Sequence, residues 1–249
     1  MIDMFSATLD DISLLRDSIA TISELIDEGE FKVRKDGIEL LASDRAVVAV
    51  VDFRFSSSNF SEYNYESDRS IGINLNNLLQ VLRRAKGNEK MRMKLSENTL
   101  DITFINGLRR HFTIPLIEMR EDVPAGIDKL AFPVSIELSP DTLGDSIDDA
   151  DLVSDSMVFE VDSEKMLITA RNDSSSTETR LESAENLKIV AEKPARARYS
   201  LDYLKKMIKA KKISENVMLS FDSNYPMRLR FDFPEKACMT FILAPRIED

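Results

Sequence analysis

The sequence predicts an α+β protein made of two similar β-rich domains, each with antiparallel sheets and two short helices. Three observations predict this class. The chain repeats itself at a nearly constant offset, apolar and polar residues alternate around short turns in both halves, and four segments carry helix-like patterns. With 249 residues, of which 43% are hydrophobic, the chain is long enough for two small domains with real cores.

The repeat is clearest when the chain is moved against itself by 128 positions. This shift places FKVRKDGIELLA at residues 31–42 on FEVDSEKMLITA at residues 159–170, and it also aligns Asp17, Ser18 and Ile19 with a second Asp-Ser-Ile at residues 145–147. Each long block alternates around a turn, which predicts a half-buried hairpin. An offset of 126 aligns the blocks at residues 74–86 and 200–212, and strand-like residues follow both. Each copy is therefore expected to run helix, hairpin, further strands, helix, hairpin.

The join between the copies is predicted within residues 117–133, IEMREDVPAGIDKLAFP. Two prolines, a glycine and mixed charges lie there between strand-like runs, which is typical of a linker. We expect an N-terminal domain at residues 1–116, a connecting loop at residues 117–131 and a C-terminal domain at residues 132–249.

Composition excludes several classes of protein. The chain has 33 basic and 44 acidic residues, a net charge of −11, so any nucleic-acid-binding surface must be local. A single cysteine, Cys238, excludes an intrachain disulfide and is expected to be a buried, inert thiol in a strand. The lone His111, expected in a strand, cannot build a histidine-rich metal site or a Ser-His-Asp triad alone. Neither a membrane-length apolar run nor a leader-like N-terminus is present, so we expect an intracellular protein.

Positive charge is concentrated on the two matched helical segments. Their apolar stripes are Leu75, Leu78, Leu79 and Leu82 in the first, and Leu201, Leu204 and Ile208 in the second. The basic residues lie off these stripes: Arg83, Arg84, Lys86, Lys205, Lys206, Lys209, Lys211 and Lys212. One such helix alone is usually a solvated face, but two equivalent helices favour a polyanion as partner. Bases without interleaved aromatic residues indicate contact with phosphates rather than reading of bases.

The other two helical segments are acidic. The segment at residues 6–24 has Arg16 against four acids, and the segment at residues 139–153 has no base. These acids face sideways, are compensated by counterions, or mark a subunit that contributes asymmetrically; the sequence leaves all three open. As an alternative, Asp145, Asp148 and Asp149 share a helical face on which carboxylates hold Mg²⁺ in some nucleic-acid enzymes. Against this alternative, the chain has no GxxxxGK[ST] loop and no HExxH motif.

Four motifs in a fixed order resemble the proliferating cell nuclear antigen family, the DNA sliding clamps, and most of all its archaeal form. They are LIDEGEFKVRKDGIELLASD at residues 25–44, RHFTIPLIEM at residues 110–119, DADLVSDSM at residues 149–157 and LAPRIED at residues 243–249. The resemblance covers the whole chain. It implies a DNA clamp fold in which three subunits close a ring, with sheets outside and two helices per domain inside. It also implies a non-enzymatic DNA polymerase processivity factor that encircles double-stranded DNA; a subunit of a heterotrimeric clamp is the alternative.

The resemblance further implies which residues do what. The bases named above, with Arg16, face DNA. A partner-peptide pocket is formed by Val48, Val50, Ile127, Pro226, Ile242, Ala244 and Pro245. Subunits join through residues 107–115 and 174–182, with Arg109 and Arg110 facing Glu178 and Glu182. The implied partners are DNA polymerase, the clamp loader, a flap endonuclease and DNA ligase, with no cofactor, metal or membrane. The location is cytoplasmic, with the nucleoid, in an archaeon, and nuclear in a eukaryote.

Overall fold

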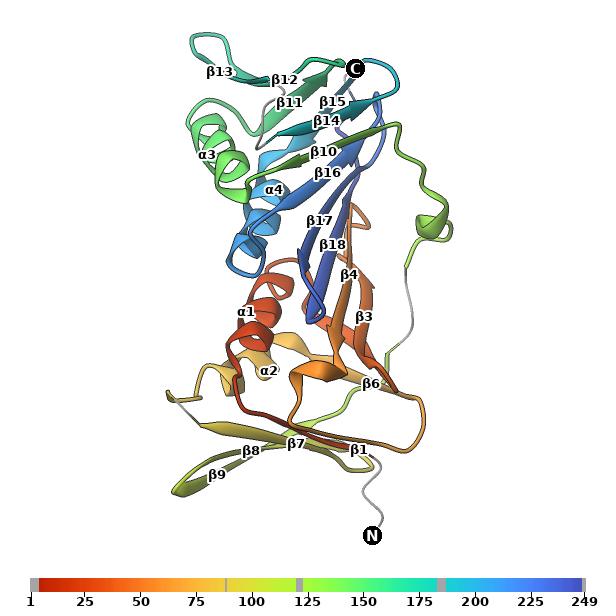
Figure 1. Ribbon diagram of the computed structural model, residues 1–249, viewed down its shortest axis with the longest axis vertical. Helices are drawn as coiled ribbons and strands as arrows, with labels where there is room; N and C mark the ends of the chain where they lie inside the picture. Colours follow the sequence, from red (N-terminus) through yellow and green to blue (C-terminus); the bar gives the residue numbers. More distant parts are fainter. Residues whose placement is uncertain (1–4, 88, 120–122, 183–186, 248–249) are drawn as a thin grey trace. The chain divides into compact units, whose positions relative to one another are not determined.

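The computed structural model describes residues 5–87, 89–119, 123–182 and 187–247, and these divide into two compact units. Unit 1 comprises the first 45 residues, residues 51–123 and residues 233–239; unit 2 comprises residues 46–50, 124–232 and 240–249. Both contain antiparallel sheets and a pair of short helices (Figure 1). None of the helices in the described part of the chain is long and apolar enough to cross a membrane.

The first half of the chain, up to Pro115, contains β1 to β9 and the helices α1 and α2. In sequence these are β1 (Phe5–Leu9), α1 (Ser13–Ile22), β2 (Glu28–Arg34), β3 (Gly37–Ser43), β4 (Ala49–Ser56), the 3-10 turn η1 (Ser57–Asn59), β5 (Glu62–Tyr65), β6 (Arg69–Asn74), α2 (Leu75–Leu82), β7 (Lys90–Leu95), β8 (Thr99–Asn106) and β9 (Leu108–Pro115). Their strands are ordered β5-β1-β7-β8-β9 in a five-stranded sheet and β4-β3-β2-β6 at one end of a nine-stranded sheet.

The second half repeats this order. After the 3-10 turn η2 (Ile127–Lys129) come β10 (Val134–Leu138), α3 (Pro140–Asp151), β11 (Ser156–Val161), β12 (Lys165–Arg171), β13 (Ser176–Glu182), β14 (Lys188–Ala191), β15 (Ala195–Ser200), α4 (Leu201–Met207), the 3-10 turn η3 (Ile208–Lys212), β16 (Val217–Phe221), β17 (Met227–Phe233) and β18 (Ala237–Leu243). Here the strand orders are β14-β10-β16-β17-β18, which completes the nine-stranded sheet, and β13-β12-β11-β15 in a four-stranded sheet. Each set of strands therefore has its counterpart in the other half, which confirms the predicted repeat.

The registers of the hairpins explain why the repeat was visible in the sequence. Phe31 pairs with Leu40 in the β2-β3 hairpin, and Phe159 pairs with Ile168 in the β11-β12 hairpin. All four side chains are buried, as the alternating pattern requires of one face of a sheet. The aligned Ile19 and Ile147 are likewise both fully buried on α1 and α3.

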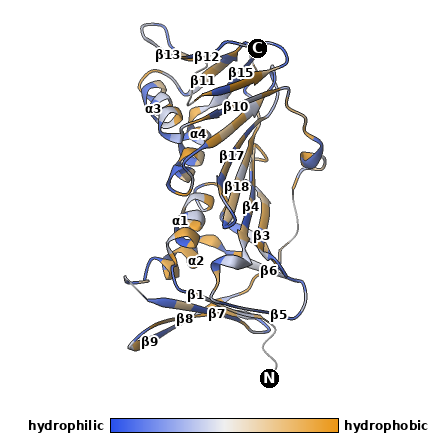
Figure 2. Ribbon diagram, in the orientation of Figure 1, coloured by the Kyte–Doolittle hydropathy of each residue, from blue (hydrophilic) through white to orange (hydrophobic). Residues whose placement is uncertain are grey.

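Each helix pair packs through the apolar stripe that the sequence predicts. All the stripe leucines and Ile208 are buried, and α1 contacts α2 while α3 contacts α4. Asn74 caps α2 by accepting a 3.0 Å hydrogen bond from the Asn77 amide, and Ser139 caps α3 in the same way. Figure 2 shows hydrophilic residues along parts of α3 and α4.

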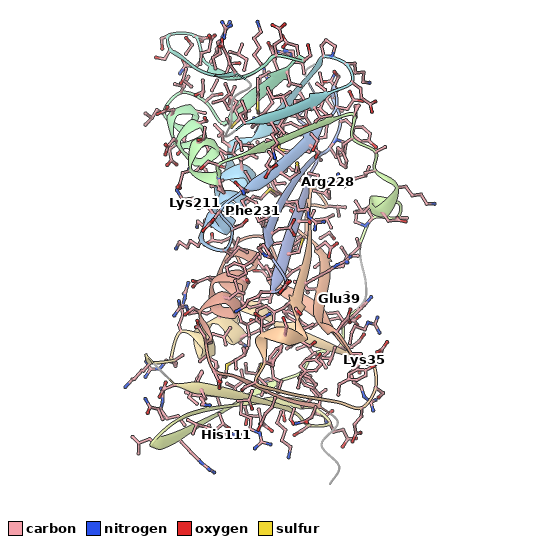
Figure 3. All side chains as sticks on the ribbon, viewed as in Figure 1. Lys35, Glu39, His111, Lys211, Arg228 and Phe231 are labelled. Atoms are coloured by element: carbon pink, nitrogen blue, oxygen red, sulfur yellow. The ribbon has the colours of Figure 1, made fainter. Side chains whose placement is uncertain are left out.

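Three expectations need correction. The first helix begins at Ser13, because residues 5–9 form the fully buried strand β1. Helix α2 ends at Leu82, so Arg83 is its C-cap and the next bases follow the helix; Lys209, Lys211 and Lys212 lie in the 3-10 turn η3. Cys238 is in a strand as expected but is only half-buried, because it alternates with the buried Ala237 and Met239. His111 lies in β9 as expected, and its side chain is exposed (Figure 3).

The predicted connecting loop starts as a fixed segment. The Ile117 amide donates a 2.9 Å hydrogen bond to the Gly72 carbonyl of β6. Gly72 has no side chain at a point where a Cβ would lie 2.2 Å from the Ile117 carbonyl oxygen, so glycine permits this close approach. Residues 120–122 of the loop lie outside the described residues. From Pro124 onward the segment belongs to unit 2, and η2 lies on the loop that precedes β10 (Figure 1).

Candidate nucleic-acid and partner interfaces

The lysines after β15 line a depression in unit 2. Its volume is 640 Å³, and its walls are Gly144 and Asp148 of α3 and Asp202, Lys205, Lys206, Ile208, Lys209, Lys211 and Lys212 of α4 and η3. Lys205 and Lys206 lie in the last turn of α4, where positive charge interacts favourably with the helix dipole. Lys206 also lies 5.7 Å from the centre of the Tyr203 ring. The structure therefore gathers all five predicted lysines around one concave surface.

Two of these lysines are paired with the acidic helix α3. Lys205 Nζ lies 2.7 Å from Asp151 Oδ2, and Lys211 Nζ lies 3.1 Å from Asp141 Oδ1. The hydrogen bond from Lys205 to Asp151 raises the pKa of Lys205. The acidity of the third helix, which had three open explanations, thus has a structural reason within unit 2: part of its charge neutralises the neighbouring lysines.

The basic residues of unit 1 are arranged differently. Arg83, Arg84 and Lys86 are exposed just after α2, and the Arg84 carbonyl accepts a 2.9 Å hydrogen bond from Arg110 of β9. Arg16 on α1 forms its ion pair with the adjacent Asp17, at 3.0 Å. Among the residues described in unit 1, the arginines of the helix pair therefore lack ion pairs across the pair like those seen in unit 2.

The Mg²⁺ alternative finds no support in the described part of the chain. Asp145, Asp148 and Asp149 are all exposed on α3, yet among the residues described no group of three or more acidic, histidine or cysteine side chains is close enough together to hold a metal ion. Asp148 instead faces the lysine-lined depression.

The predicted partner-pocket residues all belong to unit 2. The Ala244 amide donates a 2.9 Å hydrogen bond to the Val48 carbonyl, so these two predicted residues are neighbours. Val50 and Ile242 are buried, with 4% and 8% of their surfaces exposed, and can only support such a pocket from beneath. The remaining members are half-buried and able to contact a ligand: Ile127, Pro226 and Pro245.

Hydrogen bonds hold the two chain segments that flank this region. The Arg246 amide donates to the Arg198 carbonyl at 2.7 Å, and the Arg246 guanidinium pairs with Asp155 at 2.7 Å, which lowers the pKa of Asp155. The fully buried Tyr199 donates its hydroxyl to the Tyr225 carbonyl at 2.6 Å, directly before Pro226. Burial in turn raises the pKa of Tyr199.

Sequence reasoning missed an aromatic group beside Pro226. Phe132 meets Tyr225 edge to face at 5.9 Å. The guanidinium of Arg228, which is labelled in Figure 3, lies 4.5 Å from the centre of the Phe132 ring. Desolvation lowers the pKa of Arg228. The sequence did contain a signal for this group, because Phe132 is an aromatic residue next to Pro133 at the end of the predicted linker. The group places exposed ring surface next to a predicted pocket residue.

Both predicted subunit-joining segments are edge strands. β9 ends the sheet β5-β1-β7-β8-β9, and β13 ends the sheet β13-β12-β11-β15. Their eight and seven residues are mostly exposed or half-buried, and such edges carry unpaired backbone groups able to accept another strand.

The charged residues on these edges are not equivalent. Arg110 pairs with Glu89 of its own unit and lies 5.2 Å from the centre of the Phe104 ring, so its guanidinium is engaged internally. On β13, Arg180 pairs with Glu182 at 3.0 Å. Of the four predicted charges, Arg109 and Glu178 are the exposed residues left to meet a neighbouring chain.

Comparisons with known proteins agree with this architecture. The family model "Proliferating cell nuclear antigen, N-terminal domain" matches residues 4–121, and "Proliferating cell nuclear antigen, C-terminal domain" matches residues 126–246. A protein of Thermococcus fumicolans named DNA polymerase sliding clamp is 33% identical over 248 residues, 98% of this chain and 99% of the relative. A protein of the same name from Methanothermobacter thermautotrophicus is 32% identical over 246 residues, with the same coverage of both chains.

Solved structures with this fold include two clamps. The chain superposes on proliferating cell nuclear antigen from Thermococcus kodakaraensis with a TM-score of 0.87 at 25% identity, over 97% of this chain and all of that one. A structure of the Entamoeba histolytica protein gives a TM-score of 0.90 over 99% of this chain and all of that one; at 20% identity it supports the fold.

Proposed function

We propose, because the chain belongs to the proliferating cell nuclear antigen family, that it is a sliding clamp: a ring-shaped processivity factor that encircles duplex DNA and tethers DNA polymerase. The observation that carries the proposal is the repeated pair of helices in each half, with exposed bases beside both α2 and α4, within a chain of net charge −11. Positive charge restricted to these segments suits weak, sequence-independent contact with phosphates. Retention on DNA then depends on the closed ring rather than on tight binding.

The ring forms when β9 of one subunit pairs with β13 of the next. The support is that both are edge strands of similar length with exposed side chains. Backbone pairing supplies most of the contact, and Arg109 facing Glu178 adds a surface ion pair of about 0.2–1 kcal/mol. Three subunits, each with domains at residues 1–116 and 132–249 and a connecting loop at residues 117–131, close the ring.

Light scattering across a range of salt and protein concentrations tests the ring. A particle of three times the 28.3 kDa chain is the expected result. A chain that remains a monomer alone but forms a trimer with sister subunits would favour the heterotrimeric alternative.

Partner proteins dock on unit 2. A short peptide with a glutamine and paired aromatic residues fits beside Ile127, Pro226 and Pro245, over the support given by Val50 and Ile242. The exposed ring surface of Phe132 and Tyr225 extends this apolar surface. Besides DNA polymerase, we include the clamp loader, a flap endonuclease and DNA ligase among the proteins bound here. The clamp itself catalyses no reaction and needs no cofactor.

The assignment of the lysines to DNA is tested by charge reversal. The variant K205E/K206E/K209E should lose most of the stimulation of DNA synthesis by a polymerase, with an unchanged circular dichroism spectrum. The matched control K35E/K165E/K236E reverses three lysines at hairpin ends and should keep full stimulation. Equal stimulation by the two variants would remove these lysines from the DNA-facing surface.

A further inference from the structure

The two ion pairs between α3 and the lysine segment are placed at opposite ends of the helix. Asp141 is in the first turn of α3 and holds Lys211, whereas Asp151 is its last residue and holds Lys205. The pairs thus bridge the two long walls of the depression. The lysine side chains are about 40% exposed, so each ammonium group remains accessible to a competing anion.

The side chain of Lys211 passes close to Gly144 in α3. A Cβ placed on Gly144 would lie 3.5 Å from Lys211 Nζ and 3.9 Å from Lys211 Cδ. The lysine stem therefore lies against α3 at Gly144, and its Nζ reaches Asp141 in the first turn of the same helix.

Unit 1 has no equivalent of this arrangement. On and before α1, Asp17 pairs with Arg16 and Asp10 pairs with Lys90 of β7, at 3.0 Å each. Within the residues that the structure describes, Arg83 and Arg84 form no ion pair with α1. In the described part of the chain, ion pairs between the two segments of a helix pair are therefore seen between α3 and the lysine segment.

We propose that α3 is an internal competitor for DNA phosphates, in which Asp141 and Asp151 hold Lys211 and Lys205 until a phosphate displaces them. This inference rests on the proposed function, since it concerns the same DNA-facing surface. A phosphate that takes over one of these lysines must break the ion pair between the lysine and its aspartate. Salt screens this ion pair as well as the new contact with phosphate, so higher salt weakens the competitor together with the contact, and the exchange adds little to the salt dependence of binding. Unit 2 holds DNA more weakly than its five lysines suggest, which favours sliding.

The test compares two double variants that remove the same charge from the same helix. D141N/D151N removes both acids that hold lysines, whereas D145N/D149N removes two exposed acids without a role in these pairs. A linear 30-base-pair duplex can enter and leave a ring through its ends, so it reports the weak equilibrium contact with phosphates and not retention by the ring. Its affinity is measured at high protein concentration by fluorescence anisotropy between about 50 and 200 mM salt, a range over which counterion release is large. The wild-type protein provides the reference slope of log affinity against log salt.

D141N/D151N should steepen this slope by up to about 0.9 for each freed lysine, about 1.8 for the pair. Over a fourfold change in salt, that difference amounts to an extra loss of affinity of about 12-fold. D145N/D149N should bind the duplex slightly more tightly at low salt, because α3 then carries less negative charge to repel the phosphates. Its slope should stay near the wild-type value.

Equal slopes for the two double variants would overturn the competitor role while leaving the clamp intact, provided that the wild-type protein binds duplex and stimulates synthesis. A wild-type protein that does neither would overturn the proposed function together with this inference. A D141N/D151N slope that is steeper than both others supports the exchange. A merely structural role of the two acids would lower the melting temperature without changing the slope.

Discussion

Replacing Gly72 with alanine should separate the start of the connecting loop from β6. The added Cβ would lie 2.2 Å from the Ile117 carbonyl oxygen and 2.5 Å from Met119 Cγ, well inside van der Waals contact. The strand and the segment must move apart by about 1 Å. Overpacking of this kind costs about 1–3 kcal/mol. Weakening of the 2.9 Å hydrogen bond from the Ile117 amide adds about 0.5–1.5 kcal/mol.

We therefore expect G72A to lower the free energy of unfolding by about 2–4 kcal/mol. Urea unfolding followed by circular dichroism measures this quantity, because the chain has no tryptophan to report by fluorescence. Hydrogen exchange at the Ile117 amide should also become faster, which locates the change at the loop.

G144A is the matched control. A Cβ on Gly144 would meet its nearest atoms at 3.5 Å and 3.6 Å, which is ordinary contact, and the residue lies within α3. Alanine in a helix interior is favoured over glycine by roughly 0.5–1 kcal/mol, so this variant should be slightly stabilised. Equal unfolding free energies for G72A and the wild-type protein would refute the close approach of the loop to β6.

Three further predictions concern the other surfaces. I127A/P245A should bind a peptide with a glutamine and paired aromatic residues at least several-fold more weakly by calorimetry, and unchanged affinity would exclude these residues from the pocket. R109E should reduce the trimer fraction without lowering the melting temperature of the subunit. R110A should lower the melting temperature of the subunit, because the largely buried Glu89 loses its ion-pair partner. If R109E lowered the melting temperature and R110A reduced the trimer fraction instead, Arg110 would be the interface residue and Arg109 the internal one. The ion pair with Arg246 lowers the pKa of Asp155 in the folded protein. The pair therefore stabilises the folded protein at pH values above 3.8, the ordinary pKa of aspartate, and this stabilisation is lost as the pH falls from 3.8 through the lowered pKa of the folded protein. D155N should speed hydrogen exchange of the Arg246 amide at pH 7, and unchanged exchange would show that the ion pair does not hold the C-terminal segment.

Local patterns in the sequence predicted much of the fold. The two hairpins, the leucine stripe of α2 and the repeat are all carried by residues close together in the chain, where alternation or helical spacing is directly visible. The strand β1, with the sequence FSATL, was missed although apolar and polar residues alternate along it, because five residues are a short signal beside the helical pattern that follows and because the polar Ser6 and Thr8 are buried as well.

The contacts that define the site were harder to predict. Lys205 and Asp151 are 54 positions apart, and their pairing depends on how α3 packs on α4. The pairing of Arg110 with Glu89 likewise depends on the place of β9 beside α2, so the sequence could identify Arg110 as exposed charge but not as an internally held one. The positions of the basic residues could be read from the sequence. Which of them form ion pairs with acidic residues depends on how the elements pack in the folded protein.

The most direct test of the account is whether DNA topology holds the protein in place. The chain is loaded by a clamp loader onto a nicked circular plasmid, and the complex is separated from free protein by gel filtration before and after cleavage at a single restriction site. The account predicts that the protein elutes with the circular DNA and dissociates once the DNA is linear. Equal retention on circular and linear DNA, or equal loss from both, would contradict encirclement by a closed ring.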